Sequence, residues 1–105
     1  MNRLKLQILI CTYGAEGLRR VAQMNLPRLD GTGYIVSCQD PDGSIADAAL
    51  ILAPRPDVEL HMHADRGLGL NRRHAMEHAT AEFVLVADDD LNYDADALAE
   101  ALRIM

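Results

Sequence analysis

An uncharged apolar run over residues 83–87 (Phe-Val-Leu-Val-Ala) leads directly into three consecutive aspartates, Asp88, Asp89 and Asp90. A short run rich in Val and Phe predicts a buried β-strand. Three adjacent carboxylates repel one another and cannot be buried unpaired, so a divalent cation is the simplest compensation. Oxygen ligands at this spacing suit Mg²⁺, Mn²⁺ or Ca²⁺ better than zinc. The alternative is a solvated turn in which an aspartate caps the next helix.

The rest of the chain alternates between strand-like and helix-like segments. Apolar runs or alternation predict strands, and apolar residues three and four apart predict helices. Pro27 ends one such helix, and Pro54 and Pro56 end another. The predicted strands are residues 4–11, 34–38, 58–63 and 83–87, and the predicted helices are residues 15–26, 45–52, 68 or 69 to 79, and 94–104.

This alternation predicts an α/β fold, with a mainly parallel sheet covered by helices. In open sheets of this kind, ligands bind outside the carboxyl ends of the strands. Most of the conspicuous polar residues fall in the four segments that follow the predicted strands. These segments are residues 11–14, 39–44, 64–69 and 88–90.

Composition narrows the functional classes. A chain of 105 residues forms one domain. The formal net charge of −6 argues against general binding to nucleic acid. Cys11 and Cys38 have neither the density of a disulfide framework nor metal-ligand spacing, so we expect a reduced, cytoplasmic protein. The apolar stretch near the N-terminus is too short and too interrupted to be a signal peptide or membrane span.

Four stretches, in order, resemble motifs of family 2 glycosyltransferases. They are ILICTYG (residues 8–14), QDPDGS (39–44), RGLGLNRRHAMEHA (66–79) and EFVLVADDDL (82–91). They resemble a P-T-Y-N strand end, a D-D-G-S turn, a G-x-x-x-A-R-N-x-x-x-x-x-A helix and the D-x-D strand. The resemblance implies a three-layer αβα sandwich of the GT-A type, which is Rossmann-like and spore coat polysaccharide synthase-like. It covers the nucleotide-binding half of such a domain.

The resemblance also implies a nucleotide pocket. Thr12 and Tyr13 would line the pocket for the base, the alternative being that Tyr13 is a core residue at a strand end. Asp42 matches the aspartate that accepts a hydrogen bond from the base, and Asp40 is an alternative because two residues are inserted in this turn. The other reading of Asp42 is a simple Asp-Gly turn. Arg72 matches the arginine that faces the nucleotide, and Arg66 is a second candidate for this role.

In the same resemblance, Asp88 and Asp90 form the D-x-D pair. Asp90 is the best candidate to bind Mn²⁺ or Mg²⁺, with Asp88 as the second metal residue, and Asp89 or Asp88 would hold the ribose. The implied reaction is transfer of a sugar from a nucleotide-diphosphate donor, with a UDP-sugar favoured, to an unknown acceptor. No catalytic base can be named. Family domains run to roughly twice this length, so the chain resembles a donor-binding half whose sheet edge a second copy would cover as a homodimer.

Other functions stay open at this point. His74, Glu77 and His78 form an H-x-x-E-H pattern like that of inverted zinc peptidases. His61 and His63 share a face of their predicted strand, and a solvent-facing strand side is preferred to a metal site. A non-catalytic nucleotide-sugar-binding module would keep the aspartates without acceptor chemistry. A nucleotidyltransferase ranks lower, because no basic glycine-rich loop follows the first strand.

Overall fold

The computed structural model describes residues 4–24, 26–41, 43, 45, 51, 55–64 and 68–88, with only the backbone of Leu68, Gly69 and Asp88. The predicted helix over residues 94–104 lies outside the described residues, as does most of the one over 45–52. The elements run β1 (Leu6–Tyr13), α1 (Gly14–Gln23), β2 (Thr32–Gln39), β3 (Val58–His63), α3 (Leu68–Glu77) and β4 (Phe83–Asp88).

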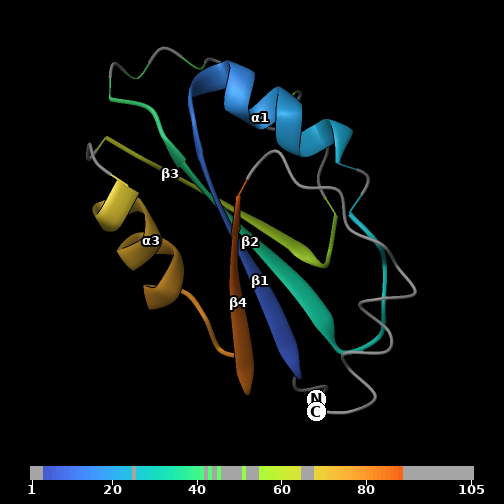
Figure 1. Cartoon of the computed structure of the whole chain (residues 1–105). Helices are drawn as coiled ribbons and strands as arrows, with labels where there is room; N and C mark the ends of the chain where they lie inside the picture. Colours follow the sequence, from blue (N-terminus) through green and yellow to red (C-terminus); the bar gives the residue numbers. More distant parts are fainter. Residues whose placement is uncertain are drawn as a thin grey trace.

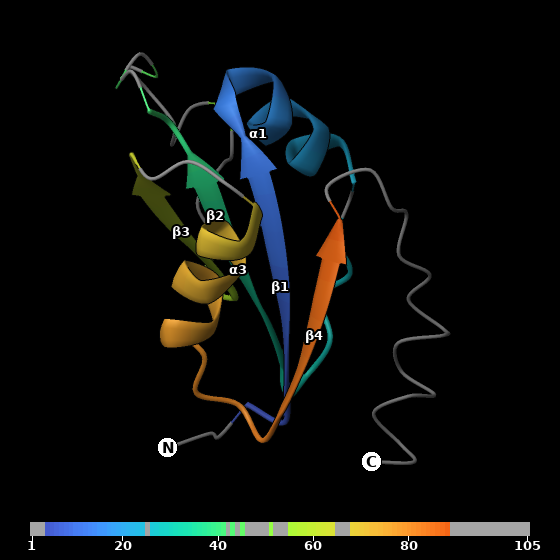
Figure 2. The ribbon, with the colours of Figure 1, turned by 60° about the vertical axis from the view of Figure 1, so that its left-hand side comes forward.

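The four strands form one parallel sheet in the order β3-β2-β1-β4. Helices α1 and α3 cover opposite faces of this sheet, as Figures 1 and 2 show. The predicted three-layer α/β architecture with a parallel sheet is therefore confirmed.

Successive side chains of β1 and β2 point to opposite faces of the sheet and build two cores. One core joins Ile8 and Ile10 of β1 to Leu18 and Val21 of α1. The other is smaller and joins Leu9 of β1, Ile35 of β2 and Ala75 of α3. All of these side chains are at most 1% exposed. This double burial explains why both strands are apolar along most of their length.

The prediction that the run over residues 83–87 is a buried strand is only partly right. Residues 83–88 do form β4, but Phe83, Val84, Leu85 and Val86 are 40–45% exposed, and only Ala87 is buried. Within the described part of the chain, β4 has β1 as its one neighbouring strand, and it therefore forms an edge of the sheet. An apolar strand edge was expected, and the homodimer that would cover it stays a prediction.

Several element boundaries differ from those predicted, among them those of β2, which spans Thr32–Gln39 rather than residues 34–38. β1 continues through Thr12 and Tyr13 because these residues pair with Cys38 and Gln39 of β2. Helix α1 ends at Gln23, before Pro27, with a tight bond from the Met24 amide to the Val21 carbonyl (3.1 Å). Helix α3 ends at Glu77, since the amides of His78 and Ala79 bond three residues back rather than four.

A compact ionic cluster fixes the sheet at the amino ends of β2 and β3. The Arg55 guanidinium donates to both carboxylate oxygens of Asp57 and to the Leu26 carbonyl (2.8 Å). The same guanidinium lies 5.9 Å from the centre of the Tyr34 ring, whose hydroxyl donates to the Pro27 carbonyl (2.7 Å). The hydrogen bond from Arg55 lowers the pKa of Asp57 below its ordinary value, against the opposing effect of burial.

Both cysteines are free thiols: Cys38 is buried and Cys11 is partly buried. Among the described helices, none has the length and apolarity that crossing a bilayer requires.

Replacing Leu18 by Ala removes the most buried side chain of α1 and leaves a cavity against β1 and β2. We expect the free energy of unfolding to fall by about 2–5 kcal/mol in urea titrations. The matched control Arg19→Ala, at an exposed position of the same helix, should change it by less than about 0.5 kcal/mol. Equal effects of the two substitutions would contradict the assignment of this core.

Asp57→Asn tests the ionic cluster through its pH dependence. A carboxylate whose folded pKa is lowered stabilises the fold above its ordinary pKa, and this contribution disappears as the pH falls through the folded pKa. We expect the variant to be less stable than the wild type by about 1 kcal/mol at pH 7. The gap should begin to close below about pH 4. A gap of constant size down to the acid limit of folding would show that the charge of Asp57 is irrelevant.

Candidate functional site

The carboxyl ends of the four strands lie along one edge of the sheet (Figure 2). The register sets Tyr13 beside Gln39 and Gln39 beside His63, so β1, β2 and β3 end level with one another. Asp88 pairs with Cys11, two residues before the end of β1. Segments that are far apart in the sequence therefore meet at the edge where the sequence predicted a ligand site.

At the end of β1, Thr12 is buried and Tyr13 is 54% exposed. Tyr13 has an extended backbone and occupies the N-cap position of α1, with no hydrogen bond from its side chain to the helix. The alternative reading of Tyr13 as a core residue is therefore wrong. An exposed aromatic ring at this edge offers a face for stacking, and its role in base recognition stays a prediction.

Gly14, which stands where the family motif carries Asn, has a φ of 67°. This left-handed conformation is open to Gly at no steric cost, and Asn adopts it more readily than most other residues. Gly14 therefore replaces Asn with another residue that tolerates this backbone conformation.

The loop after β2 is held by Asp40. Its amide donates to the His63 carbonyl at the end of β3 (2.8 Å), and its carboxylate oxygen Oδ2 accepts from the Ile45 amide (3.2 Å). Its carbonyl accepts from the amide of Gly43 (3.0 Å), which has a φ of 61°. Asp40 therefore shapes this turn, and the preferred base-binding candidate, Asp42, lies outside the described residues.

Helix α3 presents Arg72 at an exposed position. Its neighbour Arg73 is also exposed and pairs with Glu77 one turn later (3.4 Å). The second arginine candidate, Arg66, lies outside the described residues. The two neighbouring arginines thus differ: Arg73 is engaged along its own helix, whereas Arg72 forms no ion pair with any residue that the structure describes.

The acidic run begins inside β4. The backbone of Asp88 is the last residue of this strand, while Asp89, Asp90 and the side chain of Asp88 lie outside the described part. The predicted metal and ribose roles of these three residues therefore stay predictions. The backbone position of Asp88 shows that the run starts at the carboxyl edge of the sheet, where the sequence placed it.

Sequence reasoning missed Asn71, which is 2% exposed on α3. Its side-chain nitrogen donates to the Thr12 carbonyl (3.1 Å), and its side-chain oxygen lies 2.7 Å from Nε2 of His63. Asn71 therefore links the ends of β1 and β3. The available signal was its spacing of four from Ala75, which places both residues on the face that packs on the sheet.

The four histidines form two stacked pairs: His61 and His63 come from β3, His74 from α3 and His78 from the turn that follows α3. His61 stacks on His78 with ring centres 3.6 Å apart, and His63 stacks on His74 at 4.1 Å. The expectation that His61 and His63 lie on a solvent-facing strand side is only partly right: both rings are partly buried and stacked, whereas Glu59 on the same side of β3 is exposed. Among the described residues, no group of three or more His, Cys, Asp or Glu side chains is arranged to hold a metal. The zinc interpretation of His74 and His78 therefore gains no support from the residues that the structure describes.

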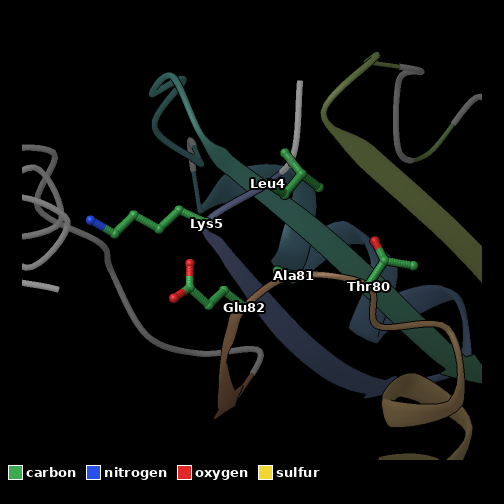
Figure 3. Close-up of a pocket in the computed structure, with 5 residues that line it drawn as sticks. All are labelled: Leu4, Lys5, Thr80, Ala81 and Glu82. Atoms are coloured by element: carbon green, nitrogen blue, oxygen red, sulfur yellow. The ribbon is translucent and has the colours of Figure 1, made fainter. Parts of the chain in front are cut away.

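A hollow of about 560 Å³ lies at the opposite end of the sheet, lined by Leu4, Lys5, Thr80, Ala81 and Glu82 (Figure 3). Nearby, the buried Gln7 side chain accepts hydrogen bonds from the amides of Thr80 (2.6 Å) and Ala81 (2.8 Å) and so holds the loop before β4. This hollow lies at the amino ends of β1 and β4, away from the strand ends that carry the candidate residues. We therefore do not regard it as the nucleotide site.

Comparison with a solved structure confirms the class of fold. The crystal structure of S. aureus TarS 1-349 matches 94% of this chain with a TM-score of 0.68, at 19% identity and over 31% of that chain. The predicted GT-A fold is thus confirmed.

Sequence comparison shows the family. The model of glycosyl transferase family 2 matches residues 32–105, which is more than half of the chain. The chain therefore belongs to glycosyltransferase family 2. The succinoglycan biosynthesis protein ExoM of Rhizobium meliloti is 30% identical over 108 residues, which cover 95% of this chain and 34% of ExoM. The chain spans about a third of the length of ExoM and of the TarS structure.

Proposed function

We propose that this chain is the donor-binding part of a family 2 glycosyltransferase and binds a nucleotide-diphosphate sugar, with a UDP-sugar favoured, at the carboxyl edge of its sheet. Thr12 and Tyr13 contact the base, together with Asp42 or Asp40. Arg72 faces the diphosphate. The sugar is then transferred to an acceptor.

The observation that carries this proposal is the level alignment of the strand ends. The register places Tyr13 of β1, Gln39 of β2 and His63 of β3 in one row across the sheet. Ligands of parallel α/β sheets bind at such an edge, where backbone groups and loop side chains converge. Membership of the family supplies the reaction class, and the aligned edge supplies a place for the donor.

Arg72 belongs to this edge because of its neighbour. Asn71 touches the Thr12 carbonyl, so this turn of α3 lies beside the end of β1. Arg72 follows immediately and points away from the buried face, since it is exposed. A guanidinium at this level offers paired donors to phosphate oxygens, which suits a donor that carries a diphosphate in an otherwise acidic protein.

The donor atoms of the acidic run fit a hard divalent cation, because all of them are carboxylate oxygens and the run starts at the same edge. Asp90 and Asp88 would hold Mn²⁺ or Mg²⁺, and Asp89 or Asp88 would hold the ribose. Such a cation, when bound, supplies electrostatic stabilisation to a leaving diphosphate. The protein's own part is to orient the donor through Tyr13 and Arg72.

A thermal-shift panel tests the donor site. We expect UDP with Mn²⁺ at about a hundred times its dissociation constant to add about 2.7 kcal/mol of stability and raise Tm by more than about 5 °C. GDP, CMP and ADP, each measured in the same way, show which base the site prefers. Asp90→Ala should abolish the dependence of the shift on Mn²⁺. If none of the nucleotides shifts Tm, the proposal for this chain is overturned.

Arg72→Ala and Arg73→Ala form a matched pair on adjacent exposed positions of α3. We expect Arg72→Ala to weaken UDP binding about tenfold or more in calorimetric titrations, because a charge-assisted hydrogen bond to phosphate is lost. Arg73→Ala loses the same charge and the pair with Glu77, and should weaken binding less than threefold. Equal losses would mean that only the net charge of the helix matters.

A further inference from the structure

The orientation of the Asn71 side chain follows from its partners. The Thr12 carbonyl can only accept, so the amide nitrogen of Asn71 must face it (3.1 Å). The amide oxygen then faces His63, and since this oxygen also only accepts, Nε2 of His63 must carry the hydrogen (2.7 Å). We call the three residues Thr12, Asn71 and His63 the Asn71 bridge.

The bridge joins three strand ends. Asn71 connects β1 with β3, and the His63 carbonyl accepts from the Asp40 amide just after β2 (2.8 Å). The His63 ring is held on its other side by stacking on His74 of α3. Its second ring nitrogen, Nδ1, is buried without a hydrogen-bond partner in the described part of the chain. Among the described residues, the contact at Nε2 is therefore the hydrogen bond that acts on this ring, beside its stacking on His74.

A polar residue at this position is costly unless its contacts are used. Asn71 is 2% exposed, and Ala75 one turn later fills the same interface with an apolar side chain. The family motif quoted above carries Ala where this chain has Asn71. Ala would pack there without any polar group to satisfy, so packing alone does not explain Asn71.

We propose that Asn71 is a positioning residue of the donor site and acts through the Thr12 carbonyl, with its own orientation set by His63. A peptide group is planar, so holding this carbonyl also holds the backbone that leads into Tyr13. The bridge thereby sets the orientation, relative to the base, of the exposed Tyr13 ring and of the Thr12–Tyr13 peptide group. This inference rests on the proposed function, since it names residues that prepare the same site.

Asn71→Asp is the first test. The substitution keeps the size of the side chain but replaces the nitrogen that faces the Thr12 carbonyl by an acceptor. The control Ala75→Gly weakens the same helix–sheet interface without touching the bridge. With UDP and Mn²⁺ in calorimetric titrations, we expect Asn71→Asp to weaken binding about tenfold or more and Ala75→Gly less than twofold. Equal losses in the two variants, or no loss in Asn71→Asp, would overturn the proposal.

A second pair of variants keeps the test valid where Asn71→Asp fails to fold. His63→Gln and His63→Leu both remove the imidazole and its stacking on His74, but only Gln retains an N–H that can donate to Asn71. We expect His63→Gln to bind UDP within about threefold of the wild type and His63→Leu to lose about tenfold. A merely structural role of His63 predicts that the two variants lose the same affinity, and that result would contradict the bridge.

Failure of the donor site and failure of the bridge are distinguishable. If the wild type binds none of the nucleotides, the proposed function fails, and the backbone resonances of Thr12 and Tyr13 then decide about the bridge. Shifts of the Thr12 carbonyl carbon and the Tyr13 amide in Asn71→Asp, absent in Ala75→Gly, support positioning of this strand end. Unchanged resonances in both variants overturn it.

Discussion

Strand β1 carries most of the constraints in this protein, because it pairs in parallel with β2 on one side and with β4 on the other. Its two faces are buried against different helices, with Ile8 and Ile10 toward α1 and Leu9 toward α3. A slip of one residue would exchange these two faces, so the register is strongly specified. The same register decides which residues reach the carboxyl edge, and Tyr13 lies there because the pairing with β2 extends to Gln39.

The two ends of the sheet are stabilised by different chemistry. At the amino end, Arg55 and Asp57 form an ion pair that also fixes the Leu26 carbonyl, and the carboxylate has a lowered pKa. At the carboxyl end, the contacts of Asn71 and His63 are hydrogen bonds to uncharged groups. Charges that already have partners at the amino end are poorly placed to meet a ligand. The carboxyl edge instead presents Tyr13 and Arg72 toward solvent.

Departures from the family motifs have different structural meanings. Gly14 in place of Asn suits the left-handed backbone at the start of α1, a conformation that both residue types tolerate. Asn71 in place of Ala changes the chemistry, because it brings a hydrogen-bonding side chain into a helix–sheet interface where Ala would only pack. The first substitution is explained by the chain's own backbone. The second is explained by a partner, His63, that lies eight residues earlier in the sequence and on a different element.

Local pattern in the sequence determined the elements that the structure describes, their alternation and the edge at which polar residues gather, because side-chain periodicity and breaker residues act over short distances. It also indicated that Tyr13 and Asp88 lie at or just after strand ends. Tertiary structure alone decided that β4 is an edge of the sheet in the described part of the chain, that the histidines stack in pairs, and that Asn71 meets Thr12. These outcomes depend on strand order and on which helix covers which face, and both arise from contacts between residues far apart in the chain. Periodicity shows whether one face of an element is apolar or polar, but only the packed fold determines which other element packs against that face.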